Sequence, residues 1–366
     1  MSSADDVAAR RLRTQRLTGE PFAAAVDAVR FLVAVQSQDY PGAKWGLGLR
    51  TRGVRDADLD ALYDAGSLLR THVMRPTWHF VLPDDIRWLL DLTAARVKAR
   101  LAPYDRRLEI DEPLLARSRA AIEAALRDGA HLTRTELAGA LERAGIPAKG
   151  QRLNHIVSYV ELDGAIVSGR RRGKQLTYAL LDERAPNARR LSGEEALGEL
   201  TLRYFTGHGP AQPQDFAWWS GLTVADARRG LALAGSALVR EDVGGRPHWS
   251  APDAPRPARA RRPLVHLLPN YDEFLIAYRD RSASLDPSLE LDDAPFPFGS
   301  ILAHVVVVDG RVWGGWKRRP NGAGAIVELG LVGPMDDSAT AALERAAVAF
   351  ERFLGAPVTM TRGVSR

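Results

Sequence analysis

Residues 131–180 read HLTRTELAGALERAGIPAKGQRLNHIVSYVELDGAIVSGRRRGKQLTYAL, and this stretch predicts a complete structural unit. Thr133 and Glu136 are spaced as a capping box, in which each side chain bonds a backbone amide of the first helical turn, so a helix should run from here to about 143. A second helix is predicted from about 150 to 162, because apolar residues recur there at helical spacing. A hairpin should follow, in which 165–167 pairs with 176–179 across a basic tip. This order is typical of a winged helix-turn-helix, whose second helix can enter the major groove of DNA.

Two other parts of the chain repeat this order. Further along, a helix at 214–220 is followed by Gly221, which suits a tight turn, and by a second helix that Thr223 and Asp226 should cap. The N-terminal copy is looser, with helices predicted at 22–35, 45–50 and 56–65 and then one strand at 71–82. Helical connectors are expected at 84–100 and 113–127.

The last hundred residues differ in character. After a connector rich in proline and arginine at 250–263, Asp309 and Gly310 predict a hairpin turn, and one helix is expected at 338–353. Strands are predicted at 264–268, 301–308, 312–318, 325–331 and 357–361. We interpret this part as a small β-barrel. The sequence therefore predicts an α+β protein with three tandem winged helix-turn-helix units at 1–128, 129–186 and 187–252, and a barrel at 263–366.

The amino-acid composition excludes some classes of function and permits others. Lys and Arg number 50 against 45 Asp and Glu, a net charge of +5 that permits a polyanionic partner. Most of the basic residues are arginine, which suits phosphate and base edges but equally reflects a GC-rich genome, since Ala and Gly are also abundant. The absence of cysteine excludes disulfides, thiolate nucleophiles and iron–sulfur clusters. The eight histidines are scattered, and we interpret Asp272 and Glu273 as a structural corner, so no metal and no cofactor are expected.

The segment that follows the first helix carries the candidate chemistry. Gln36 and Gln38 should lie on an extended stretch, where residues i and i+2 share a side, so both carboxamides could meet one small target. The competing interpretation is that the glutamines only tie down loop backbone. Asp39 is either a carboxylate of the site or, as we favour, a helix cap. His79 is either a supporting neighbour of the amides or a packed strand residue, the latter being the more common case.

A basic cluster at the tip of the central hairpin predicts contact with DNA. It comprises Arg170, Arg171, Arg172 and Lys174, and a solvated turn is the alternative interpretation. Arg152 on the polar face of the preceding helix is predicted to join them. Lys44, the one lysine near the glutamines, is expected to contact phosphate or solvent and not to act as an amine nucleophile.

Three segments resemble the signature segments of the AlkZ/YcaQ family of winged-helix DNA glycosylases. They are VQSQDYPGAKWGLGLR, RTHVMRPTWHFVLPDD and LLPNYDEFLIAYRDR, in the family's order, within a resemblance that spans about 8–362. It implies a C-shaped clamp on double-stranded DNA. The family's catalytic motif falls on Gln36 and Gln38, and Gln-x-Gln implies the azinomycin-resistance branch, which unhooks interstrand crosslinks, whereas Gln-x-Asp marks the branch with broader alkylated-purine substrates.

The expected function is therefore a monofunctional DNA glycosylase that hydrolyses the N-glycosidic bond of N7-alkylated purines and unhooks crosslinks, in DNA repair or toxin self-resistance. The alternative is a non-catalytic winged-helix regulator, and a nuclease is disfavoured because no acidic metal cluster is visible. Double-stranded DNA is the expected partner. We further expect a cytoplasmic monomer, because no secretory or membrane segment is visible in the sequence.

Overall fold

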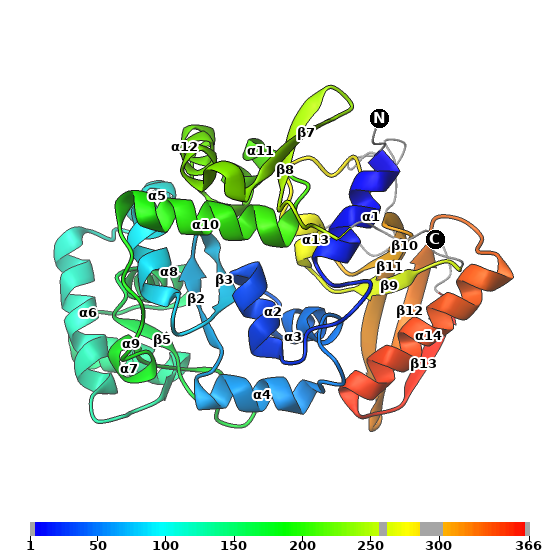
Figure 1. The fold of residues 1–366 in the computed structure, drawn as a ribbon. Coiled ribbons are helices and arrows are strands. Elements are labelled where there is room, and N and C mark those ends of the chain that lie inside the picture. Colours follow the sequence, from blue (N-terminus) through cyan, green and yellow to red (C-terminus); the bar gives the residue numbers. More distant parts are fainter. Residues whose placement is uncertain (1–3, 256–261, 286–302, 363–366) are drawn as a thin grey trace.

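The computed structural model describes residues 4–255, 262–285 and 303–362. The N-terminal part contains α1 (Ala4–Thr14), α2 (Ala25–Leu32), α3 (Tyr40–Gly48) and α4 (Asp56–Ala65), together with a three-stranded antiparallel sheet of order β1-β3-β2. Its strands are β1 (Ala34–Gln36), β2 (Leu69–Val73) and β3 (Arg75–Val81). Helices α2–α4 and this sheet occupy the middle of the molecule (Figure 1).

Two predictions for this part were wrong. The helix expected at 22–35 ends at Leu32, because Val33 adopts φ 70° and the chain continues as β1. The single strand expected at 71–82 is a hairpin, because Met74 turns the chain at φ 63°. Positive φ is rare for residues with a Cβ, so nothing in the periodicity could reveal either turn.

The central unit follows the predicted order. After α5 (Ile86–Arg107) and α6 (Glu112–Leu126) come β4 (Leu132–Thr133), α7 (Arg134–Arg143), α8 (Gly150–Leu162), β5 (Ile166–Ser168) and β6 (Thr177–Leu180). The capping box is confirmed, since the Glu136 backbone N–H donates to Thr133 Oγ1 and the Thr133 N–H donates to the Glu136 carboxylate. Strand β6 pairs with both β4 and β5.

Two helices that were not predicted from the sequence, α9 (Leu181–Arg184) and α10 (Gly193–His208), precede the third repeat. The repeat itself follows the predicted order, with α11 (Pro213–Ser220), α12 (Val224–Ala234), a 3-10 turn at Gly235–Ala237, and the hairpin of β7 (Val239–Val243) and β8 (Arg246–Ser250). Thr223 and Asp226 form the expected capping box, and Gly221 ends α11 at φ 75°.

The C-terminal strands form an open sheet, and the predicted barrel was not found among the described residues. The strands are β9 (Val265–Leu268), β10 (Val305–Val308), β11 (Arg311–Asn321), β12 (Gly324–Leu331) and β13 (Val358–Arg362), in the order β13-β12-β11-β10-β9. The short helix α13 (Glu273–Ile276) follows β9, and α14 (Asp337–Leu354) precedes β13. Because α14 carries the chain across one face of the sheet, β13 joins β12 in parallel at the edge opposite β9.

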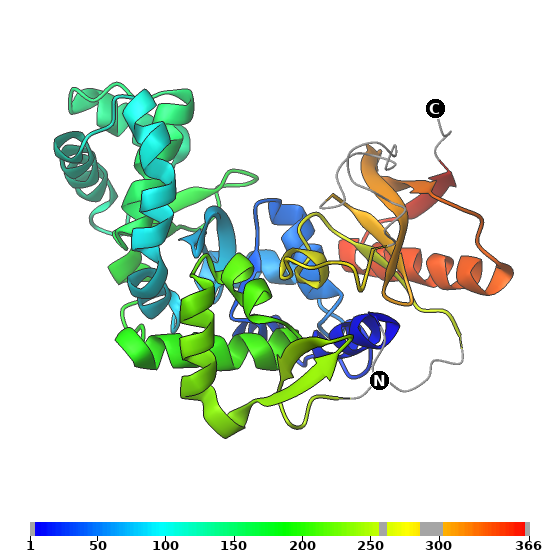
Figure 2. The same cartoon turned by 90° about the horizontal axis from the view of Figure 1, so that it is seen from above.

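The three largest hydrophobic clusters of the described residues each join several of these parts. One joins the first sheet to α5 and to α10–α12, and a second joins α2–α4 to the C-terminal sheet and α14. A third joins α6 to α7, α8 and β5. All three clusters thus cross the predicted domain boundaries, which stay predictions. Seen from above, the central unit and the C-terminal sheet stand at opposite ends of the molecule, with β1–β3 and α2–α4 between them (Figure 2).

Candidate active site

The turn from β1 to α3 holds the Gln-x-Gln motif. Gln36 is the last residue of β1, and Asp39 caps α3 by accepting a hydrogen bond from the Gly42 backbone N–H at 3.2 Å. A Cβ at residue 42 would lie 2.7 Å from the Asp39 carboxylate, so only glycine lets this cap close. The favoured interpretation of Asp39 as a helix cap is confirmed. Its other oxygen accepts from Asn270 at 3.1 Å, which leaves this carboxylate engaged in structure.

Gln36 is fixed from two sides. Its side-chain oxygen accepts a hydrogen bond from Arg75 Nη2 at 2.6 Å, and its backbone N–H donates to Glu273 Oε1 at 2.9 Å. The residue is only 5% exposed. Its amide nitrogen has no hydrogen-bond partner among the described residues, in contrast to its oxygen. The two donors of the Gln36 amide are therefore left unpaired by the described residues.

Gln38 has a different environment. Its side chain is exposed, and its oxygen makes one long contact, at 3.4 Å, with the backbone N–H of Trp78. The two glutamines are therefore not equivalent, although the sequence pattern treated them alike. One amide is held and the other is free to move.

His79 lies directly opposite Gln36 in the β1–β3 pairing and on the same face of the sheet. Its Nδ1 is 2.9 Å from the Thr77 carbonyl, which accepts its proton. Burial is the main cause that lowers the pKa of His79 well below its usual value, and the nearby Arg75 guanidinium adds to the effect. His79 is therefore a packed, neutral strand residue at neutral pH, whose buried Nε2 has no partner among the residues that the structure describes.

Glu273 and Asp272 belong to this site, and sequence reasoning did not count them as site residues. Glu273 is buried and also accepts from Trp219 Nε1 at 3.0 Å, while Asp272 forms a two-pronged pair with the buried Arg50 at 2.8 Å. The interpretation of the pair as a structural corner is confirmed. The only signal for Glu273 was its place in the third signature segment.

The predicted DNA-binding side chains have different surroundings. Lys44 is buried, and its ammonium pairs with Asp56 at 2.9 Å and Asp60 at 2.7 Å, so it presents no free charge to phosphate, contrary to expectation. Arg171 is held by Asp60 and Asp64 of α4 at 2.8 and 2.9 Å. Arg170 and Lys174 are exposed.

The remaining two predicted DNA contacts are partly engaged. Arg172 is exposed but bonds Glu136 at 2.7 Å, and Arg152 donates to the Leu108 carbonyl at 3.0 Å. Solvent competes with both contacts, so either arginine can exchange its partner for a phosphate oxygen.

Unpartnered polar atoms gather around the first sheet. The side chains of Ser37, Thr71, Thr77, Trp78 and His79 each bury a polar atom that has no hydrogen-bond partner in the described residues. Native proteins pair most buried polar atoms, so such a cluster indicates a functional site. The described residues contain no group of three or more side chains suited to hold a metal ion.

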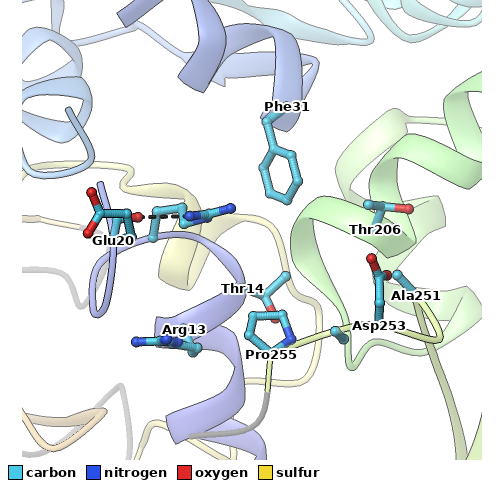
Figure 3. Close-up of a pocket in the computed structure, with 10 residues that line it drawn as sticks. Arg13, Thr14, Glu20, Phe31, Thr206, Ala251, Asp253 and Pro255 are labelled. Carbon is cyan, nitrogen blue, oxygen red and sulfur yellow. Dashed lines mark hydrogen bonds between the residues drawn. The ribbon is translucent and has the colours of Figure 1, made fainter. Parts of the chain in front are cut away.

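A separate pocket of about 240 Å³ lies between α1, α2 and α10 (Figure 3). Arg13, Phe31, Thr206 and Asp253 line it. This pocket contains none of the predicted site residues.

Among the described residues, no helix is both long and apolar enough to cross a membrane.

Comparison with known proteins shows the family and the fold to which this chain is similar. A curated relative from Streptomyces sahachiroi, an interstrand DNA cross-link repair glycosylase, is 26% identical over 324 residues, which cover 85% of this chain and 86% of the relative. The solved structure of the Streptomyces sahachiroi DNA glycosylase AlkZ superposes with a TM-score of 0.79 at 24% identity, covering 98% of this chain and 99% of that one, and so shares its fold. The model of the AlkZ-like DNA glycosylase family matches residues 29–353. This chain therefore belongs to the AlkZ-like family of DNA glycosylases.

Proposed function

We propose that this protein hydrolyses the N-glycosidic bond of N7-alkylated purines in double-stranded DNA, including purines that crosslink the two strands, in repair or in self-resistance to an alkylating toxin. The observation that carries this proposal is the pair of uncharged amides at 36 and 38 on a turn whose second amide is exposed. The curated relative is itself named for crosslink repair, which supports the same substrate class.

The chemistry explains why two weak groups suffice. Alkylation at N7 makes a purine cationic and therefore a good leaving group, so a strong general acid is not needed. The enzyme must instead position water at C1′ of the sugar and stabilise the positive charge that develops there. A carboxamide can hold a water molecule or a polar substrate atom, although it is a poor base.

The different environments of the glutamines favour different roles. Because Arg75 already occupies the oxygen of Gln36, the NH2 group of Gln36 is left to donate to a sugar or phosphate oxygen of the substrate. Gln38 retains an accessible oxygen that can accept a proton of the attacking water. In this assignment Gln36 steadies the nucleotide and Gln38 orients the water.

An exposed motif also suits a crosslinked substrate. A nucleotide tied to the opposite strand cannot be swung fully out of the duplex, so the catalytic group must reach the base. The turn between β1 and α3 meets this demand because it ends in the exposed Gln38.

The fold supports a winged-helix clamp around DNA. The helix–turn–helix–hairpin order of α7–β6 and of α11–β8 is that of winged-helix units, and Arg170 and Lys174 at the hairpin tip are available for phosphate. Arg172 and Arg152 join them after exchanging their present partners. The buried, doubly paired Lys44 supports a monofunctional enzyme, because two aspartates engage its side-chain nitrogen and burial screens it from a sugar carbon.

Release of free base tests the proposal. Duplexes that carry N7-alkylated or N7-crosslinked guanine are incubated with the protein, and released base is measured by chromatography. We expect Gln38→Ala to abolish most release and Gln36→Ala to reduce it strongly, while DNA affinity is retained. Gln175→Ala, at an exposed residue of the hairpin, is the matched control.

Two outcomes would contradict the proposal. If the wild-type protein binds the duplexes but releases no base, the non-catalytic regulator becomes the better description. A covalent adduct trapped by borohydride and lost in Lys44→Ala would instead establish amine chemistry and exclude a monofunctional enzyme.

A further inference from the structure

A cavity of about 240 Å³ lies beside the Gln-x-Gln turn, between the first sheet and the central unit. Tyr63, Trp78, Glu161 and Tyr178 are among its lining residues. The backbone of Trp78 contacts the turn directly, since its carbonyl accepts from the Ser37 N–H at 2.7 Å and its N–H approaches Gln38 at 3.4 Å. The cavity and the proposed catalytic turn therefore share a wall.

Glu161 brings an unsatisfied carboxylate to this cavity. The side chain is 0% exposed, and its Oε2 accepts a hydrogen bond from His72 Nδ1 at 2.5 Å. Its Oε1 is buried and has no partner among the described residues. A buried carboxylate oxygen without a donor is costly, so a donor from a ligand would remove a penalty that the free protein carries.

Trp78 adds an unsatisfied donor on an aromatic wall. Its Nε1–H is buried without a partner in the described part of the chain. Its ring packs against His72 with centroids 4.2 Å apart, and the Arg70 guanidinium lies 4.5 Å from its centroid. The wall of the cavity thus holds one unpartnered acceptor, one unpartnered donor and flat aromatic surfaces, and a ligand reaches the two buried polar atoms only when the side chains over them move aside.

The two arginines of the cavity do not satisfy Glu161. Arg70 donates to the Ser37 carbonyl at 3.0 Å, and Arg134 donates to the Gly150 carbonyl at 3.1 Å. Both remain cationic neighbours, which suits the phosphate of a nucleotide entering beside them.

We propose that this cavity is a guanine subsite that holds the base of an N7-alkylguanine monoadduct swung out of the duplex. Guanine carries the N1 and N2 donors next to the O6 acceptor, which matches an acceptor at Glu161 and a donor at Trp78. The cationic charge of the alkylated base favours it over unmodified guanine beside a carboxylate. Adenine presents a donor where guanine presents O6, so it fits the same groups poorly.

This subsite rests on the proposed glycosylase function. It would hold one class of substrate, the monoadducts, and not the other, the crosslinks. A monoadduct can leave the stack and enter the cavity, whereas a crosslinked guanine is tethered and cannot. Loss of the Glu161 acceptor should therefore impair monoadduct release and leave crosslink unhooking nearly unchanged.

The test compares three duplexes under single-turnover conditions: one with N7-methylguanine, one with N3-methyladenine and one with a guanine–guanine crosslink formed by a nitrogen mustard. We expect Glu161→Gln to slow N7-methylguanine release about ten- to a hundredfold, the discrimination usual for base-edge hydrogen bonds, and to change the other two rates little. Glu142→Gln, the same chemical change at an exposed position of α7, is the control and should match the wild type.

Trp78→Phe keeps an aromatic ring but removes the unsatisfied donor, so it too should slow N7-methylguanine release and change the other two rates little. If Glu161→Gln fails to fold, this variant tests the subsite in its place. Unchanged N7-methylguanine release, or equal losses on all three duplexes, would overturn the subsite. A wild-type protein that releases no base from any duplex would instead overturn the proposed function itself.

Discussion

At the residue scale, the catalytic proposal depends on how Gln36 is held. Arg75 is the residue that fixes which end of this carboxamide is left unpaired, because its guanidinium can bond only the oxygen. Burial lowers the pKa of Arg75 to about 10, so the group still carries its charge at neutral pH. Arg75 is therefore a positioning residue that acts through Gln36.

Replacing Arg75 should affect turnover more than binding. In Arg75→Met the Gln36 amide can rotate, and we expect kcat for base release to fall by up to about a hundredfold, the usual cost of misplacing a reacting group, with little change in KM. Single-turnover and steady-state kinetics on an N7-alkylated duplex measure the two effects.

Arg75→Lys keeps one donor and should recover part of the rate, which a purely structural role would not explain. A variant whose KM rises while kcat is unchanged would show that Arg75 serves DNA binding instead.

At the element scale, the hairpin of β5 and β6 is tied to α4 of the first unit. Arg171 is only 20% exposed, and besides its two ion pairs its backbone N–H donates to Asp64 at 2.8 Å. The hairpin tip therefore both links two units and presents charge. Arg171 performs the first task, whereas Arg170 and Lys174 are left for the second.

The hairpin residues should differ in how much each contributes to the salt dependence of DNA affinity. Each phosphate contact contributes about 0.9 to the slope of log affinity against log salt, so the Arg170→Ala, Lys174→Ala double variant should lower the slope by about two. Arg171→Ala should leave the slope nearly unchanged and lower the melting temperature. Fluorescence anisotropy with an undamaged duplex provides the affinities.

An unchanged slope in the double variant would contradict DNA contact at the tip. A reduced slope in Arg171→Ala would mean that DNA displaces the two aspartates on binding.

At the scale of the whole molecule, the candidate site lies where the N-terminal part meets the C-terminal sheet. Trp45 Nε1 donates to the Leu267 carbonyl at 2.6 Å, and the Arg50–Asp272 pair lies beside this contact. A Cβ at residue 48 would lie 2.6 Å from the Phe353 ring, so glycine is required for α3 to approach α14 this closely. These contacts place Glu273 next to β1, where its carboxylate accepts a hydrogen bond from the backbone N–H of Gln36.

Breaking the Arg50–Asp272 pair should destabilise the whole molecule. In Asp272→Asn the buried guanidinium loses its counter-charge, and the free energy of unfolding should fall by about 3 to 5 kcal/mol. Urea denaturation followed by tryptophan fluorescence measures this loss.

Replacing both partners, as in Arg50→Met with Asp272→Leu, removes the unpaired charge and should cost much less than the single change. Equal losses in the single and double variants would show that packing, and not the charge, determines the effect.

The amino-acid sequence by itself determined the helix caps, most helices and hairpins, and the position of the Gln-x-Gln turn. Thr133, Thr223 and Asp39 act within four residues of chain, so their hydrogen bonds are encoded locally. The tertiary structure alone decided that Gln36 is held by Arg75 and by Glu273, 237 residues away, and that aspartates enclose Lys44 and Arg171. It also decided that the C-terminal sheet stays open among the described strands. Charge–charge and cross-strand partners are selected by packing between distant segments, and a single sequence carries no periodic signal for that selection.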